Sequence, residues 1–286
     1  MTTNFNASET YFGIEIEGHL SIETVQRERM TIGNYHHGIQ VPFLPTGWSA
    51  ERDGSIRTPN GRVACEIVSP KLKGAEGIAE VIRVLGILNE KGMKVNASCG
   101  LHCSVSWDRN HSSELLSTLI SITSYLESGL FAITGTKSRE RGTYCNGIKK
   151  WGNAKNAKKY MDPYRYTTLN ITNLYRGCDR VEFRVFSGST SATKIVGWIQ
   201  VCIGIVERAL TTRRLPAWNP KPTVGGWKKT GPGASECERL MGYLAWSDGC
   251  RRLHNGKQFG WISDEIPQDE IKKEFRRLAK QYDAEP

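Results

Sequence analysis

Two short segments of this sequence alternate acidic residues with apolar ones. In the first, Glu15 and Glu17 alternate with isoleucines, and in the second, Glu182 precedes Arg184 by two positions. Residues two apart share one face of a β-strand, so the members of each pair project from the same side. Two carboxylates held about 6–7 Å apart repel each other unless cations lie between them. The spacing therefore indicates strand faces that bind cations.

Two further segments carry polar side chains in the same alternating pattern. His102 and Ser104 share a face within 101–107, and Asn170 lies within 166–174. Any one of these strands taken alone is better explained by a solvated face. If all four faces line one cleft, their carboxylates and imidazole suit two or three hard divalent cations, because Mg²⁺ and Mn²⁺ accept oxygen ligands and one His. Arg184 cannot ligate a metal and fits better as a donor to a phosphoryl group.

The elements that must position these side chains do not follow a regular strand–helix–strand order. Apolar alternation predicts strands at 11–20, 63–68, 101–107, 166–174 and 180–187, and apolar residues at helical spacing predict helices at 74–91, 112–133, 191–212 and 268–282. Residues 139–166 are predicted to be irregular and 216–235 to form a linker rich in Pro and Gly. This order predicts an α+β fold, with a mainly antiparallel sheet and helices packed on one of its faces.

Composition narrows the class of protein and its partners. The chain has 286 residues and a net charge of +10, which favours anionic partners such as nucleotides, nucleic acid or an acidic substrate, although a solubilising surface explains the charge equally well. No stretch reaches the roughly 20 apolar residues of a membrane span, and the N-terminus has no signal peptide. The eight cysteines lack zinc-site spacing. We therefore expect a cytoplasmic protein with reduced thiols and no membrane partner.

Five motifs, taken together and in order, resemble the putative amidoligase family. They are F-G-I-E-I-E at 12–17, D-G-S at 53–55, C-E-I-V-S-P at 65–70, C-G-L-H at 99–102 and V-E-F-R-V-F at 181–186. That family belongs to the carboxylate–amine ligase superfamily, with glutamine synthetase and glutamate–cysteine ligase. The resemblance implies a glutamine synthetase-like catalytic domain over 11–215, with a curved, mainly antiparallel sheet lining the active site. We expect residues 1–10 to be disordered and 216–286 to form a linker and a helical extension packed on the catalytic domain.

The resemblance also implies roles for single residues. The expected metal ligands are Glu15, Glu17, Glu66, His102 and Glu182. The expected catalytic residues are Arg184, which resembles a phosphate-binding arginine, Arg139 and Arg141 near the substrates, and Asp53, an acidic residue that is also a candidate proton acceptor. Asn170, Tyr144, Ser69 and Ser104 are the expected contacts to ATP or substrate.

The implied activity is an ATP-dependent ligase that joins a carboxylate to an amine through an acyl phosphate, with Mg²⁺ (or Mn²⁺) bound to ATP. The sequence identifies neither the acid nor the amine, each of which is a small molecule, a peptide or a protein. Two alternatives remain open. One is a metal- and ATP-dependent phosphotransferase on the same scaffold. The other is a nucleic-acid-associated protein, suggested by the basic, aromatic segment 149–165.

Overall fold

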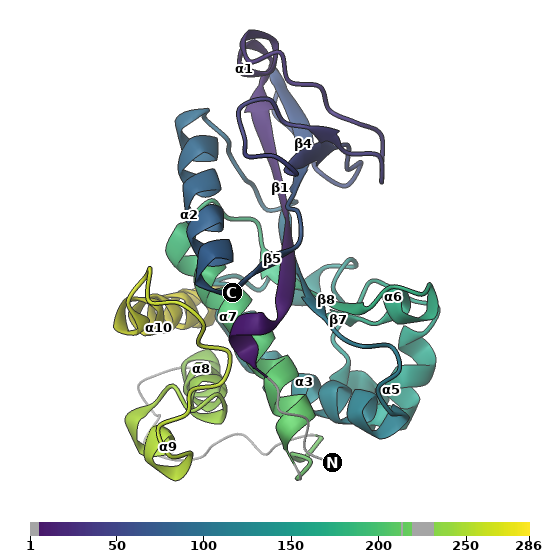
Figure 1. Ribbon diagram of the computed structural model, residues 1–286, viewed down its shortest axis with the longest axis vertical. Helices are drawn as coiled ribbons and strands as arrows, with labels where there is room; N and C mark the ends of the chain where they lie inside the picture. Colours follow the sequence, from purple (N-terminus) through teal and green to yellow (C-terminus); the bar gives the residue numbers. More distant parts are fainter. Residues whose placement is uncertain (1–5, 213, 219–231) are drawn as a thin grey trace.

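The computed structural model describes residues 6–212, 214–218 and 232–286, and an eight-stranded antiparallel sheet is its central element. The strands are β1 (Tyr11–Ser21), β2 (Ile39–Gln40), β3 (Ser49–Glu51), β4 (Arg62–Val68), β5 (Leu72–Lys73), β6 (Gly100–Ser106), β7 (Leu169–Asn170) and β8 (Arg180–Ser187). Their order is β2-β3-β4-β1-β6-β8-β7, and β5 pairs with β1 off this path. The long strand β1, purple in Figure 1, therefore lies between the two halves of the sheet.

Helices pack against this sheet. The α-helices are α1 (Ile22–Arg27), α2 (Gly74–Glu90), α3 (Ser113–Ala132), α4 (Ser138–Arg141), α5 (Ala154–Met161), α6 (Thr172–Tyr175), α7 (Ala192–Thr211), α8 (Pro232–Tyr243), α9 (Asp248–Leu253) and α10 (Gln268–Ala284). Helices α2, α7 and α10 lie on one side of β1, and α5 and α6 lie on the other (Figure 1). The predicted α+β class, with an antiparallel sheet and helices, is confirmed.

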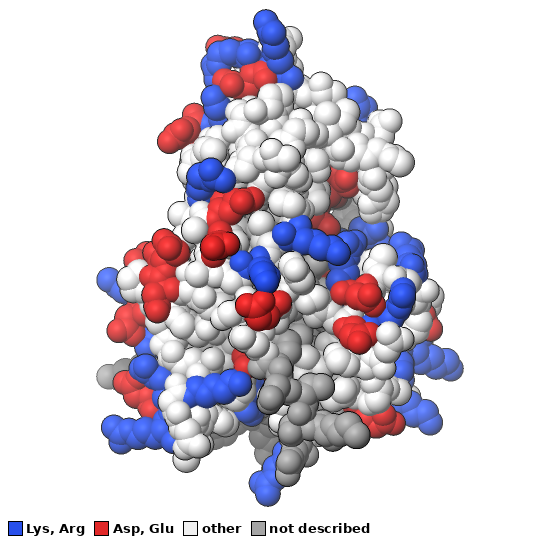
Figure 2. Space-filling model, viewed as in Figure 1, with Lys and Arg blue, Asp and Glu red and all other residues white. Residues whose placement is uncertain are grey.

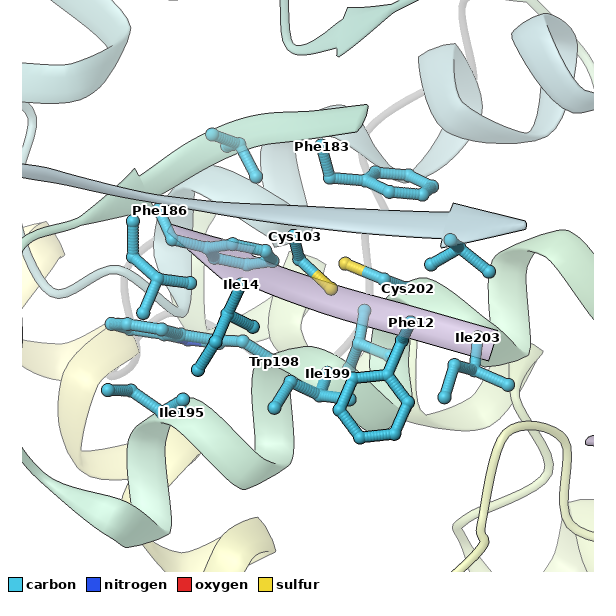
Figure 3. Packing of buried hydrophobic residues seen from close by; sticks show 14 of the residues in the cluster. Phe12, Ile14, Cys103, Phe183, Phe186, Ile195, Trp198, Ile199, Cys202 and Ile203 are labelled. Atoms are coloured by element: carbon cyan, nitrogen blue, oxygen red, sulfur yellow. The ribbon is translucent and has the colours of Figure 1, made fainter. Parts of the chain in front are cut away.

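Helix α7 supplies the main contact with the sheet. Its residues Ile195, Trp198, Ile199, Cys202 and Ile203 recur at helical spacing and face the apolar side chains of the strands (Figure 3). The ring of Trp198 stacks on Phe186 of β8, with ring centroids 4.9 Å apart and planes inclined by 12°. The apolar face of the sheet is buried against α7. Because side chains alternate along a strand, the polar residues of β1, β6 and β8 lie on the opposite face of the sheet.

The other long helix of the core, α3, is long and apolar enough to span a membrane by length and composition. Within the described residues it is the single helix that meets this test, and 72% of its apolar window is buried inside the fold. Its burial against α5, α7 and α8 is that of a core helix.

Charged side chains are interspersed over the face shown in Figure 2. Lys and Arg alternate with Asp and Glu there and do not gather into one basic patch. This face therefore offers no single basic patch to an anionic partner.

Several segments differ from the sequence-based expectation. The strand predicted at 166–174 is only two residues long, because Asn170 Oδ1 accepts hydrogen bonds from the backbone N–H and the hydroxyl of Thr172, which turns the chain into α6. The segment 139–166 contains α4 and α5, where an irregular segment is predicted. Residues 7–9 form a short 3₁₀ helix in the region predicted to be disordered. Most of the predicted linker, 219–231, lies outside the described residues, and α8 begins at Pro232.

Replacement of Trp198 by alanine tests this packing. Trp198 is fully buried, stacks on Phe186, and donates a hydrogen bond from Nε1 to the Ile133 carbonyl at 3.1 Å. We expect Trp198→Ala to lower the free energy of unfolding by about 3–5 kcal/mol, measured by urea denaturation. Leu253→Ala, at a residue that is 82% exposed, is the control and should change it by less than about 0.5 kcal/mol. Equal stabilities of the two variants would contradict the described core.

Candidate metal centre and its flanking clefts

The register of the sheet gathers acidic residues that are far apart in the sequence. Glu17 on β1 is directly opposite Glu66 on β4, and Glu66 is in turn opposite Glu51 on β3. On the other side of β1, Glu15 is opposite His102 of β6. All of these side chains point away from α7, so one face of the sheet carries a row of carboxylates with an imidazole among them.

A β-bulge brings β8 into this row. Leu101 pairs with Phe186 and Cys103 with Phe183, so two residues of β8, Arg184 and Val185, lie opposite the single residue His102. Such a bulge bends the strand and re-aims its side chains.

The bulge places Arg184 beside its neighbours in the site. Arg184 Nη1 lies 3.5 Å from His102 Nδ1 and makes an ion pair with Glu182. Glu182 is fixed from its other side by Asn170 Nδ2, which donates to Oε2 at 2.7 Å.

His102 is the geometric centre of the cluster. Its Nδ1 atom lies 2.9 Å from Glu15 Oε2, 3.6 Å from Glu66 Oε1 and 3.7 Å from Glu182 Oε1. Its Nε2 atom lies 3.3 Å from Glu17 Oε1. One ring nitrogen can bond one of three such oxygens through a proton, whereas a cation among them would contact all of them.

Two overlapping groups of ligand atoms have dimensions suited to metal ions. The first consists of Glu15, Glu66 and His102, and the second of Glu17, Asp53 and Glu66. The ligand atoms of each group lie within 4.8 Å of one another, and opposite ligands of an octahedral Mg²⁺ are about 4.2 Å apart, from its 2.0–2.1 Å bonds. Glu66 belongs to both groups, so its carboxylate has the position of a bridge between two ions.

The burial, hydrogen bonding and pKa of Glu66 test independently whether a metal ion fits this position. Its carboxylate is buried, and Oε1 has no hydrogen-bond partner among the described residues. Burial, followed by repulsion from Glu15, Glu17 and Asp53, raises the pKa of Glu66 from 4.5 to about 10. An unpartnered buried oxygen among like charges is costly unless a proton or a cation satisfies it, and the donor set fits a divalent cation.

Glu182 behaves in the opposite way because it has a cationic partner. Burial alone would raise its pKa, but Arg184, His102 and the hydrogen bond from Asn170 outweigh burial and lower the pKa to about 2. Glu182 in turn raises the pKa of Arg184 against the effect of burial. Among the described residues, Arg184 is the one arginine in an ion pair with Glu15, Glu17, Asp53, Glu66 or Glu182, which leaves an excess of four negative charges without such a partner when all five are ionised. Two divalent cations would neutralise that excess.

Clefts lie on both sides of the candidate metal centre. The first, here called the Glu15 cleft, has a volume of about 560 Å³ and runs along the start of β1 between Ser69, Lys71, Ser104 and Arg180. The second, here called the Glu17 cavity, has a volume of about 220 Å³ and is bounded by carboxylates, three arginines and three tyrosines. Its lining residues are Glu17, Tyr35, Asp53, Ser55, Ser98, His102, Arg139, Tyr144, Arg165, Tyr166 and Arg184.

Arg139 lies between the backbone of two strands at the Glu17 cavity. It is 8% exposed, and its Nη2 donates to the Arg184 carbonyl at 2.6 Å. A Cβ at Gly100 would lie 2.9 Å from both of its terminal nitrogens, so glycine at this position is what lets the guanidinium lie against β6. Gly100 also donates its backbone N–H to Glu17 Oε2 at 2.6 Å. The same residue therefore fixes a carboxylate and makes room for an arginine.

The C-terminal residues hold the segment that carries Arg139. Glu285 Oε2 accepts a hydrogen bond from the Lys137 backbone N–H at 2.7 Å, and Glu285 Oε1 accepts one from the Thr136 hydroxyl at 3.2 Å. Arg141 donates to the Pro286 carbonyl at 2.6 Å. Helix α4 is thus tied to the end of α10 on its outer side.

Most of the residues expected at the site lie close together in the structure. It brings together Glu15, Glu17, Glu66, His102, Glu182, Arg184, Arg139, Asp53 and Asn170, with Tyr144 on the wall of the Glu17 cavity and Ser69 and Ser104 in the Glu15 cleft. Arg141 is the exception. It is exposed, donates a hydrogen bond to the Pro286 carbonyl, and lines neither the Glu15 cleft nor the Glu17 cavity. The expected catalytic role of Arg141 therefore has no support in this geometry.

Four residues at the site were not expected from the sequence. Glu51 lies beside Glu66 on β3, a strand of three residues that is too short for alternation to reveal. Tyr35, Arg165 and Tyr166 close one side of the Glu17 cavity. Arg165 Nη1 donates to the Tyr35 hydroxyl at 2.6 Å, and its guanidinium lies 5.5 Å from the Tyr166 ring centroid. Arg165 and Tyr166 are neighbours in the connection between α5 and β7, whereas Tyr35 lies between α1 and β2, and no local pattern in the sequence links Tyr35 to the other two.

Comparison with known proteins adds one match. A family described as "putative amidoligase enzyme" matches residues 8–153, just over half of the 286 residues. This range contains Glu15, Glu17, Asp53, Glu66 and His102. No curated protein matches the chain.

Glu66→Gln tests whether this carboxylate is a ligand. Between its ordinary pKa of 4.5 and the raised value of about 10, folded Glu66 holds a proton that the unfolded chain releases, so wild-type stability falls as pH rises through this window. We expect the glutamine variant to be more stable than wild type in buffer with EDTA, by a margin that grows from about pH 5 to about pH 8. Urea denaturation at several pH values measures this margin.

With Mg²⁺ or Mn²⁺ added, the order should reverse, because the cation stabilises the ionised wild-type site and the glutamine cannot replace a bridging carboxylate. A Glu90→Gln variant, at the exposed last residue of α2, is the matched control. A cation that stabilised Glu66→Gln as much as wild type would show that Glu66 is not a ligand.

Proposed function

This chain belongs to the putative amidoligase family, and from that premise we propose that it is an ATP-dependent ligase that forms an amide, peptide or isopeptide bond between a carboxylate and an amine. The family assigns it to ligase-type enzymes. ATP, Mg²⁺ and an acyl-phosphate intermediate are the finer parts of the proposal.

One observation carries the proposal: Glu66 is shared between two groups of ligand atoms that lie between two clefts. Glu15, His102 and Glu66 would hold one Mg²⁺, and Glu17, Asp53 and Glu66 a second. When bound, these ions would offset negative charge on the phosphate oxygens and on the substrate carboxylate. Because three protein ligands leave half of an octahedral Mg²⁺ open, such a pair suits a phosphorylated substrate.

The two clefts differ in a way that suits two different substrates. The Glu15 cleft is the larger, combines apolar with polar walls, and carries Lys71 and Arg180, which suits a nucleotide with a flat base and charged phosphates. The smaller Glu17 cavity carries Arg139 and Arg184 next to the carboxylates, which suits a small acidic group. We therefore assign ATP to the first and the acid to the second.

The chemistry assigned to these residues is positioning and neutralisation. A carboxylate oxygen of the acid attacks the γ-phosphorus of ATP, and the bond from phosphorus to the leaving ADP oxygen breaks. The amine nitrogen then attacks the carbonyl carbon, the bond to the phosphate oxygen breaks, and inorganic phosphate leaves. Arg184, held by Glu182, is the donor nearest to the metal centre and would stabilise the transferred group. Asp53 lies on a loop that lines the Glu17 cavity, and we assign to it the proton that the amine loses.

A cytoplasmic location forms part of the proposal, because ATP is available there. The cysteines of the described residues, all unpaired, are compatible with a reducing compartment.

A screen of ATP turnover against pools of acids and amines tests the proposed function. We expect phosphate release that requires both an acid and an amine, product masses equal to acid plus amine minus water, loss of activity with EDTA and recovery with Mg²⁺ or Mn²⁺. Arg184→Lys should lower kcat by about 10³-fold, because lysine lacks the planar fork of donors. Turnover that needed an acid but no amine would favour a phosphotransferase, and activity that survived EDTA would refute the metal centre.

Gly100→Ala separates the role of Arg139 from that of the fold. The added methyl group displaces the end of a flexible side chain, so we expect unfolding free energy to change by less than about 1 kcal/mol. The loss of Arg139 from the cavity should nevertheless reduce kcat/KM for the acid at least about tenfold, the size of one charge-assisted hydrogen bond. Gly86→Ala, where nothing lies within 4 Å of the new Cβ, is the matched control and should leave activity unchanged. Normal activity in Gly100→Ala would remove Arg139 from the site.

A further inference from the structure

A third cleft adjoins the Glu17 cavity and has no role in the function proposed above. Its volume is about 630 Å³. We call it the Arg57 cleft, and its lining residues are Gly54, Ser55, Arg57, Asn96, Ala97, Ser98, Ser138, Arg139, Gly142, Thr143, Tyr144 and Cys145. Four of these residues, Ser55, Ser98, Arg139 and Tyr144, also line the Glu17 cavity. The two spaces therefore share a wall, and the Arg57 cleft is the larger of the two.

The charges of the two spaces differ. The described charged residues that line the Arg57 cleft are Arg57 and Arg139, with no Asp or Glu among them, whereas the Glu17 cavity contains Glu17 and Asp53 beside its three arginines. Asp53 and Ser55 are two residues apart on the lip between the two spaces, where the Ser55 backbone N–H donates to Asp53 Oδ1 at 2.6 Å. A molecule that extended across this lip would meet carboxylates only at the end in the Glu17 cavity.

The cleft has features of a built binding surface. Arg57 is held by its backbone, since its N–H donates to Ser98 Oγ at 2.9 Å and its carbonyl accepts from Asn96 Nδ2 at 2.6 Å, while its side chain stays exposed. On the opposite wall, Arg139 is more than nine-tenths buried, and its Nε atom has no hydrogen-bond partner among the described residues. Neither arginine has an ion pair with a carboxylate among these residues. A buried guanidinium without a counter-charge favours an anionic ligand.

We propose that the Arg57 cleft binds the amine substrate and that this amine carries a carboxylate of its own, as an amino acid or a peptide does. Its amino group points into the Glu17 cavity, toward Asp53 and Glu17, and its carboxylate lies against Arg57, with Arg139 on the wall between this carboxylate and the acid substrate. This inference rests on the proposed ligase function, in which the amine is joined to the acid. It adds the chemical class of the amine, which the sequence does not identify.

A binding experiment tests the cleft without any turnover. The probes are a pool of dipeptides and the same pool with amidated C-termini, titrated by calorimetry into the full-length protein with Mg²⁺. Wild type should bind the free peptides at least about tenfold more tightly than the amides, and Arg57→Gln should abolish this difference. Arg83→Gln, on the exposed side of α2, is the matched control and should preserve it. Equal binding of both pools by wild type, no binding of either, or an unchanged preference in Arg57→Gln would each overturn the inference.

Kinetics then separates this inference from the proposed function. With an acid found in the screen, Arg57→Gln should raise KM for the amine about tenfold and leave KM for the acid and kcat unchanged. A rise in KM for the acid instead would show that the cleft holds the acid, and turnover only with amines that lack a carboxylate would also overturn the inference while the ligase function stands. Arg57-dependent peptide binding without ATP turnover on any acid would instead refute the ligase function and leave the cleft assignment intact.

Discussion

Mutual repulsion of buried carboxylates is the constraint on which this structure depends. Glu17, Glu66 and Glu182 are buried around His102, with Glu15 beside them and Asp53 next to Glu66. Among the described residues, Arg184 is the one arginine in an ion pair with any of these carboxylates. A flexible loop would move such groups apart. Here they lie mainly on strands, whose register is fixed by backbone hydrogen bonds and by the apolar layer against α7 on the other face. The core therefore stabilises an arrangement that is unfavourable without cations, as expected of a site held ready for its ligands.

Much of the fold and most residues of the acidic row could be predicted from the sequence, because the alternation of side chains along a strand is a strong local signal. The alternation in 11–20 and 180–187 indicated which side chains share a face, and the helical spacing of apolar residues located α2, α3, α7 and α10. The same reasoning failed at 166–174, where the Asn170 side chain bonds the backbone and replaces the strand by a turn. It also missed Glu51, because β3 is three residues long and its apolar pattern is too short to recognise.

The cavity walls could not be predicted because they depend on contacts between distant segments. Arg139 and Arg141 are indistinguishable by type and spacing, yet α4 directs one toward the sheet and the other toward Pro286. The different positions of the two arginines depend on contacts with distant parts of the chain. Gly100 leaves room on one side of α4, and Glu285, in the part of the chain beyond the family match, holds the other. Likewise, Tyr35 and Arg165 meet across 130 residues of sequence.

Most acidic residues of the site lie on strands and many of the cavity-lining residues lie on loops, and this arrangement has an evolutionary consequence. Glu15, Glu17, Glu66, His102 and Glu182 all lie on strands. Inserting or deleting one residue in β1 would turn its carboxylates into the apolar layer and its isoleucines toward the acidic face. Asp53, Arg57, Tyr144 and Arg165 instead lie on connecting segments that tolerate changes in length. Relatives of this chain are thus free to acquire new substrates by remodelling those connections while they inherit the same reaction. We therefore expect differences in substrate between relatives to lie in the loops, and the residues that they share for the reaction to lie on the strands.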